Sequence, residues 1–224
     1  NGDYKDTVWL KDSIFALKYY IITDNRTIVQ NSLDKIIDLI GTDNQRPSIC
    51  FDKSLNPISI RSFQSKQSID IQNNVLGEIL WLYSEVKARD YRLGKKWLNK
   101  INEIIDILWE EKYWEQPDSG MWRMESDVRS SSIGICLGGL RQLTNWPEWN
   151  NKKLNALIDE GEESLNLLLP NETENRKEDS ALLSLIWPFR VVNKRMSIKI
   201  IGKVFNNLKG QVAVKRFIGD PYYF

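Results

Sequence analysis

Apolar residues recur at the three-to-four-residue spacing of an amphipathic helix through most of the chain. Stop signals divide this pattern, because Gly41, Pro170, Pro188 and Gly210 each follow an apolar run. A glycine or proline in that place typically ends a helix. We therefore predict eight helices, at about 7–22, 28–40, 70–88, 94–112, 130–143, 152–169, 179–187 and 195–208.

The range 42–68 has no sustained period and carries Pro47, Pro57 and many Ser and Asn residues. We predict a long ordered loop there, with a short hairpin at 49–60, since loops of this length are usually functional or disordered. No convincing strand alternation occurs elsewhere. The connections between helices alternate between short and long, which predicts an all-α domain of antiparallel helical hairpins spanning 1–224.

Composition excludes several classes of function. The 224 residues include 31 basic and 30 acidic side chains, so a net charge of +1 indicates no nucleic-acid partner. The chain has no histidine, which excludes Ser-His-Asp and Cys-His catalysis and removes the commonest metal ligand. We expect neither a metal nor a cofactor. Cys50 and Cys136 are far apart and lack metal-ligand spacing, which predicts two reduced thiols in or near the core.

Targeting signals are equally sparse. No apolar run approaches 18 residues and the N-terminus is polar, so we expect no membrane association and a cytoplasmic location. The first residue is Asn1 rather than Met, and we therefore expect a fragment or a processed product.

The range 109–135 holds the most chemistry. It places three tryptophans, several carboxylates and the turn Pro117-Asp-Ser-Gly120 between two helical patterns. A loop rich in aromatic rings and acids is what a sugar pocket requires. If the hairpins curl into a ring, the long tryptophan-bearing loops collect at one end, which is the expected binding face.

Two further segments begin predicted helices, and each has a structural alternative. In Trp9-Leu-Lys-Asp12, the aspartate could simply interact favourably with the helix dipole, and for this segment taken alone we prefer that explanation. The functional alternative is a tryptophan that stacks on a sugar beside a Lys-Asp pair that binds its hydroxyls. In Gln72-Asn-Asn74-Val-Leu-Gly77, the amides could cap the helix or bind sugar hydroxyls in both directions. Gly77 within a helix predicts close approach of a neighbouring helix.

A fourth segment lies near the C-terminus, where Arg216 and Asp220 stand among aromatic residues just past a helix end. They could form a polar clamp on a ligand. The alternative is a chance ion pair on a surface loop, which would contribute little to stability if exposed.

Together these segments resemble the family 15 glycoside hydrolases, the glucoamylase family, and within it the branch of bacterial homologues and phosphorylase kinase α/β subunits. The matching motifs occur in the family's order over nearly the whole chain: Trp9-Leu-Lys-Asp12, Gln72-Asn-Asn-Val-Leu-Gly77, Pro117-Asp-Ser-Gly-Met-Trp-Arg123, Ser130-Ser-Ser-Ile-Gly134, Ser184-Leu-Ile-Trp-Pro-Phe189 and Val214-Lys-Arg-Phe-Ile-Gly-Asp220.

The resemblance implies an (α/α)6 toroid, of which this chain would supply the N-terminal and middle part. It implies an α-linked glucan or malto-oligosaccharide as substrate, with glucose released from the non-reducing end by inversion. Inversion requires two carboxylates, one to protonate the leaving oxygen and one to activate water. It also implies a set of substrate-binding residues: Trp9, Lys11, Asp12, Gln72, Asn74, Trp122, Arg216 and Asp220.

The chain departs from the family where catalysis is concerned. Arg123 follows Trp122 at the position of the general acid, and arginine does not release its proton at any useful pH. The general base belongs to a region beyond Phe224, so neither catalytic residue is intact; Glu125 is a weak substitute for the acid. Lys11 and Asn74 replace an Arg and an Asp of the family.

Two hypotheses follow from this resemblance. One is a glucoamylase-like hydrolase domain with impaired or no activity. The other is a non-catalytic glucan-binding or regulatory module similar to the phosphorylase kinase subunits. In both, a half-toroid would expose helix faces, and a second chain could complete it.

Overall fold

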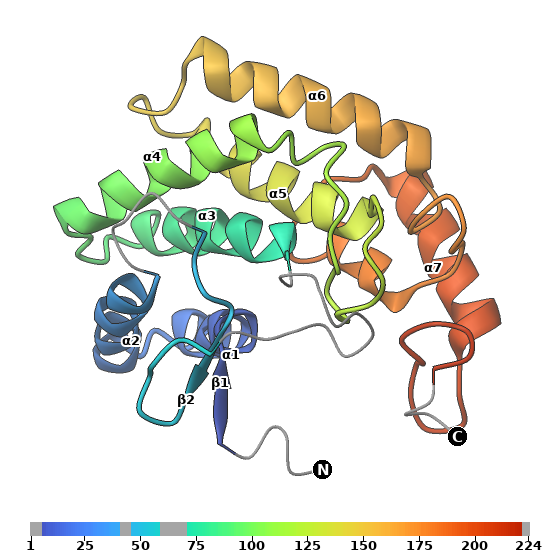
Figure 1. Ribbon diagram of the computed structural model, residues 1–224, viewed down its shortest axis with the longest axis horizontal. Helices are drawn as coiled ribbons and strands as arrows, with labels where there is room; N and C mark the ends of the chain where they lie inside the picture. The colour runs from blue at the N-terminus through green and yellow to red at the C-terminus, as the bar shows by residue number, and fades with distance from the viewer. Residues whose placement is uncertain (1–5, 41–45, 59–70, 221–224) are drawn as a thin grey trace.

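The structure is a computed structural model that describes residues 6–40, 46–58 and 71–220 (Figure 1). Over these residues the fold is all-α, as predicted, and it also contains a small two-stranded sheet. The elements, in chain order, are β1 (Thr7–Trp9), α1 (Leu10–Ile22), α2 (Arg26–Leu39), β2 (Cys50–Asp52), α3 (Asn73–Lys87), α4 (Lys95–Glu110), α5 (Ser130–Leu143), α6 (Lys152–Leu168), the 3-10 helix η2 (Ser180–Leu185) and α7 (Lys194–Leu208).

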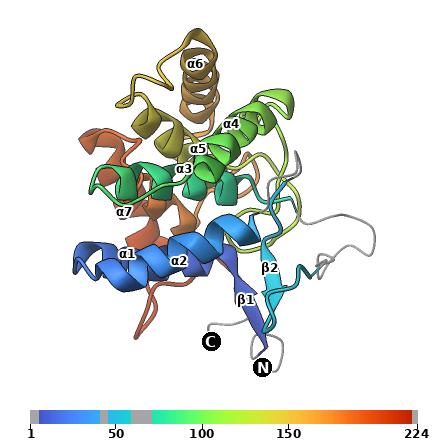
Figure 2. The ribbon, with the colours of Figure 1, turned by 90° about the vertical axis from the view of Figure 1, so that its left-hand side faces the viewer.

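The α-helices form antiparallel hairpins in two layers. Helices α1, α3 and α5 lie side by side, and each is followed by a helix that packs back on it: α2 on α1, α4 on α3 and α6 on α5 (Figure 1). Figure 2 shows the first hairpin, α1 with α2, beside the two strands. The predicted helical hairpins are therefore confirmed.

Burial along each helix follows from this layering. Helix α4 buries one stripe, which includes Trp97, Ile101 and Leu108, and its other face is mostly polar apart from Leu98 and Trp109. Helix α3 lies between α1, α4 and α5 and is buried nearly all round, as its almost continuous apolar run from Val75 to Tyr83 requires. The most extensive helix contact is between α3 and α5.

Small residues permit that contact. A Cβ on Gly77 would lie 2.5 Å from the Cys136 backbone nitrogen, and one on Gly139 would lie 2.6 Å from the Gly77 carbonyl oxygen. The close approach predicted at Gly77 is confirmed. Cys50 and Cys136 are both buried and unbridged, which confirms the prediction of core thiols.

The sequence prediction missed one strand and one helix type. Residues Thr7–Trp9 were expected to open the first helix, but they form β1, which pairs antiparallel with β2 so that Val8 faces Phe51. The predicted hairpin at 49–60 is present in its described part, where the Ile58 amide donates to the Cys50 carbonyl at 2.9 Å. The helix predicted at 179–187 is the short 3-10 helix Ser180–Leu185.

Candidate functional site

The loop between α4 and α5 is fastened by Asp118, which is fully buried. Its carboxylate accepts the Asn73 backbone N–H at 2.9 Å and the Ser132 hydroxyl at 2.9 Å, so it joins the N-terminal ends of α3 and α5. The Arg129 guanidinium lies 3.9 Å from the same carboxylate. Burial raises the pKa of Asp118 to about 6, although these hydrogen bonds and Arg129 oppose the shift. The Pro117–Gly120 turn therefore has a structural role at its base.

Glu172 caps α5 from a distant loop. Its carboxylate accepts the Ser131 backbone N–H at 3.1 Å and the Ser131 hydroxyl at 2.5 Å. The serines on either side of Ser131 bond elsewhere, since Ser130 donates to the Asn171 carbonyl and Ser132 to Asp118. Burial, and then the nearby charge of Asp179, raise the pKa of Glu172 to about 8.

A cavity of about 210 Å³ opens where the loop meets the start of α1. It collects side chains from three segments that are far apart in the sequence. They include five of the predicted substrate-binding residues together with Arg123. The lining is Trp9, Lys11, Asp12, Met121, Trp122, Arg123 and Arg216. We call this the Trp9 cavity.

One wall is built around Trp9. The Arg123 guanidinium carbon lies 4.8 Å from the centroid of the Trp9 ring, a cation–π distance. Arg123 has a positive φ of 56°, so the chain turns sharply here and does not run extended. Lys11 donates from its ammonium group to the Met121 carbonyl, which ties the first turn of α1 to the loop.

A second part of the lining is built around Trp122. Its indole N–H donates to the Asp179 carboxylate at 2.7 Å, which fixes the ring. The Arg216 guanidinium carbon lies 5.8 Å from the Trp122 ring centroid and forms two 2.6 Å hydrogen bonds to Asp220. The Asp220 side chain is buried, so the pair is more than a chance surface contact. These hydrogen bonds to Asp220 fix the orientation of the Arg216 guanidinium.

The structure places Gln72 and Asn74 in the core and not among the residues that line this cavity. The Asn74 amide donates to Glu78 at 3.0 Å. Among the described residues, neither polar atom of the Gln72 side chain has a hydrogen-bond partner. Glu78 is fully buried, and its burial raises its pKa to about 7, while Asn74 and Lys11 oppose the shift and Asp12 adds to it. Sequence reasoning missed Glu78, although a lone acid in an otherwise apolar run was the available signal.

Among the described residues, Asp12 is the one acid that lines the Trp9 cavity. It is exposed, and its side chain makes no hydrogen bond to another described residue. Glu125 is exposed and lies outside the lining. Glu111, just past the end of α4, pairs with Arg46. In the described part of the chain, no group of three or more acids or cysteines is arranged to hold a metal ion.

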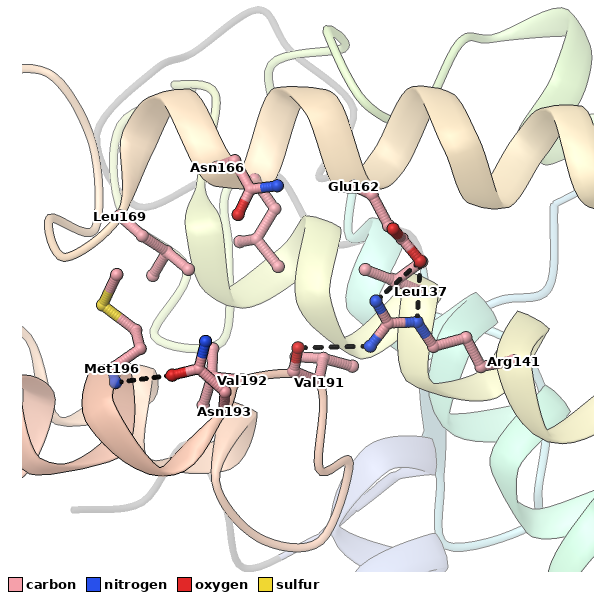
Figure 3. A pocket seen from close by; sticks show the side chains of 10 residues that line it. Leu137, Arg141, Glu162, Asn166, Leu169, Val191, Val192, Asn193 and Met196 are labelled. Atoms are coloured by element: carbon pink, nitrogen blue, oxygen red, sulfur yellow. Dashed lines mark hydrogen bonds and ion pairs between the residues drawn. The ribbon is translucent and has the colours of Figure 1, made fainter.

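A second, smaller cavity of about 80 Å³ lies between α5, α6 and the segment Val191–Met196 (Figure 3). Its charged groups satisfy one another, since Arg141 binds Glu162 at 2.7 Å and the Val191 carbonyl at 3.2 Å. Asn193 caps α7 by accepting the Met196 N–H at 2.9 Å. We interpret this cavity as a packing seam between helices.

Across the residues that the structure describes, no helix has the length and apolar character needed to cross a membrane.

Comparisons with known proteins point to one class of fold. No protein-family model matches the chain, and no curated protein matches it either. Solved structures do match. A wild-type glycosidase superimposes with a TM-score of 0.74 at 18% identity over 97% of this chain, and a glycosidase variant in complex with glucose with a TM-score of 0.76 at 17% identity over 97%. This chain spans 65% of the length of each of those two proteins. At such identities the likeness concerns the fold, and the fold of this chain is glycosidase-like.

Proposed function

We propose that the Trp9 cavity binds a glucosyl unit of an α-linked glucan, and that the chain is a glucoamylase-like domain without hydrolytic activity of its own. The observation that carries this proposal is the convergence of Trp9 and Trp122 with Lys11 and Asp12 in one cavity. The motifs that resemble the glucoamylase family supply the rest of that lining, and the glycosidase-like fold supports the same class of ligand.

The lining matches the chemistry of a sugar. Indole rings offer flat apolar surfaces to the C–H faces of a pyranose, and few convergent polar groups fix its orientation, as in small-molecule sites generally. Asp12 accepts from hydroxyls, whereas Lys11 and Arg216 donate to them. A volume of about 210 Å³ suits one sugar ring more than a long oligosaccharide.

Hydrolysis by inversion requires a protonated acid beside the glycosidic oxygen and a second carboxylate on the opposite face of the ring. Arg123 stands where the family resemblance puts the acid, and its guanidinium stays charged at any useful pH. Asp12 alone cannot fill both roles. We therefore propose binding without turnover.

The second candidate function is a regulatory glucan-binding module, as the resemblance to phosphorylase kinase α/β subunits implies. The stacking of Arg123 on Trp9 favours it, because this contact places a fixed cation at the position where a hydrolase needs a proton donor. The two candidates share the ligand and the lack of turnover, and they differ in whether sugar binding regulates another activity.

We also propose that the hairpins are part of an (α/α)6 toroid that a second chain completes. The inner layer of α1, α3 and α5 supports this geometry. Helix α7 buries Ile200, Val204 and Leu208 on one side but exposes Ile198, Ile201 and Phe205 on another, so it has an apolar face with no partner among the described residues. Light scattering after gel filtration tests whether a second chain packs on this face of α7. The double variant Ile201→Ser, Phe205→Ser should abolish self-association. A parent protein that stays monomeric and soluble would contradict the proposal.

Two assays test the main proposal. Calorimetric titration with maltose and maltotriose should give saturable binding, and no heat at millimolar sugar would contradict the sugar site. Glucose release from maltotriose should be absent in the unaltered protein, and measurable turnover would show that it is a hydrolase. Arg123→Glu is a further probe, because it places a carboxyl beside Trp122. Asp12 is the one other acid in the described lining, so we still expect no turnover, with sugar binding retained.

A further inference from the structure

A third cavity, of about 320 Å³, lies at the other end of α1 from the Trp9 cavity. Lys18 and Ile22 line it from the second half of α1, Glu85 and Arg89 from the end of α3, Gln142 from the end of α5, and Trp187 to Arg190 from the segment before α7. Because a 13-residue helix is about 20 Å long, the two cavities are separate sites.

The cavity carries more positive than negative charge. Glu85 is paired with Arg89 at 2.9 Å, so these two charges offset each other. Lys18 instead places its ammonium nitrogen 3.8 Å from the centroid of the Trp187 ring and 4.6 Å from that of Trp81. Arg190 makes no hydrogen bond or ion pair with any residue in the described ranges. Two cations therefore remain without a carboxylate of their own.

These cations are close enough to disfavour each other. Burial lowers the pKa of Lys18, and the positive charges of Arg190 and Arg89 lower it further, against the raising effect of Glu85. An anion between Lys18 and Arg190 would remove this repulsion.

Helix dipoles are the ordinary reason for cations at such a place, because α3 and α5 both end there. That reason accounts for Arg89, which donates to the Glu85 carbonyl at 2.8 Å. It does not account for Lys18, which contacts aromatic rings and no carbonyl, or for Arg190, which lies outside the helices.

We propose that this cavity binds a phosphorylated monosaccharide, with the phosphate between Lys18 and Arg190 and the sugar ring against Trp187. A phosphate monoester carries a charge of about −1.5 to −2 at neutral pH, which matches two cations better than a single carboxylate does. Trp187 is 56% exposed, so the part of the residue that Lys18 does not cover is open to a ligand. The Gln142 amide can both donate to and accept from a hydroxyl. The remaining volume accommodates a ring beyond the phosphate.

Calorimetric titration of the protein with four probes tests this site: glucose 6-phosphate, inorganic phosphate, glucose and adenosine monophosphate. We expect glucose 6-phosphate to bind at least about tenfold more tightly than inorganic phosphate, and glucose not to compete with it. Arg190→Gln should weaken glucose 6-phosphate binding at least about tenfold and Trp187→Ala about fivefold. Arg195→Gln, an exposed arginine on α7 away from the cavity, is the matched control and should change nothing.

Absence of binding, equal binding by Arg190→Gln, equal affinity for inorganic phosphate, or tighter binding of adenosine monophosphate would each overturn the proposal. Maltose binding by the Arg190→Gln variant separates the two sites. Maltose affinity should be the same in this variant as in the parent protein. A failed titration with glucose 6-phosphate therefore does not contradict sugar binding in the Trp9 cavity, and a failed titration with maltose does not contradict phosphate binding beside Arg190.

Discussion

The base and the tip of the α4–α5 loop differ sharply, although they are only a few residues apart. At the base, Asp118 and Arg129 are almost fully buried and bonded to the ends of two helices. At the tip, Trp122 and Arg123 are half-buried and line a cavity. The base determines where the tip lies, while the tip makes the contacts available to a ligand.

This difference bears on our proposal of sugar binding without catalysis. Replacing a residue at the base leaves buried groups without partners, which costs free energy of folding. Replacing one at the tip alters mainly what the cavity can bind. An arginine at position 123 is therefore compatible with an intact fold, because the loop's position depends on Asp118 and its partners.

Asp118→Ala should have the largest effect, at the base. It leaves Arg129 without its buried counterion and removes acceptors from the Asn73 N–H and the Ser132 hydroxyl. Breaking a buried pair costs about 3–5 kcal/mol, so we expect a loss of that order in the free energy of unfolding, measured in urea. Glu125→Ala, at an exposed position in the same loop, is the control and should change it by less than about 0.5 kcal/mol. Equal losses would remove the distinction between base and tip.

Glu78 predicts a dependence of stability on pH. The pKa of Glu78 is about 7 in the folded protein, against a usual value of 4.5. Its contribution to the free energy of unfolding is therefore most favourable below pH 4.5 and declines as the pH rises to 7. A shift of this size is on the order of 3 kcal/mol. The free energy of unfolding of Glu78→Gln, relative to that of the parent protein, should therefore rise by about 2–3 kcal/mol from pH 5 to pH 8. Urea titrations at both values, compared as a difference, cancel the contributions of other carboxyls; a constant difference would contradict the shifted pKa.

Gly77→Ala tests the packing on which the base depends. The new Cβ would lie 2.5 Å from backbone atoms of α5, which cannot rotate away as a side chain could. We expect a loss of about 1–3 kcal/mol, measured by the same unfolding curves. Gly202→Ala is the matched control, because nothing lies within 4 Å of its Cβ in helix α7. It should stabilise the protein by about 0.5–1 kcal/mol, and a loss there similar to that at Gly77 would count against the close contact.

The helices and the Gly77 contact could be predicted from sequence because both depend on local composition. The apolar stripe of α4 and the almost wholly apolar α3 each indicate their surroundings directly. Strand β1 could not be predicted, because its three residues merge with the pattern of α1 and pair with β2 more than 40 residues later in the chain.

The Trp9 cavity was predicted through motifs, and its supports were not. Glu172 and Asp179 lie in or next to a polar loop without periodicity, and nothing local shows that one caps α5 and the other holds Trp122. Gln72 and Asn74 were predicted to bind substrate, a prediction that stays open, although their burial sets them apart from the residues that line the cavity. Long-range partners of this kind become visible only when the chain is folded.

Trp9→Ala should have the smallest effect on folding and the clearest effect on binding. The half-buried ring carries the Arg123 contact, and it forms one wall of the cavity. Loss of one aromatic wall is worth about 0.5–1.5 kcal/mol, so maltose affinity should fall by up to about tenfold in calorimetry. Trp109→Ala, a 40% exposed tryptophan that packs on Trp114 away from this cavity, should leave affinity unchanged. If both variants weakened binding equally, the effect would come from general destabilisation. A selective loss at Trp9 would place sugar recognition at the tip of the loop and separate it from the bonds at the base.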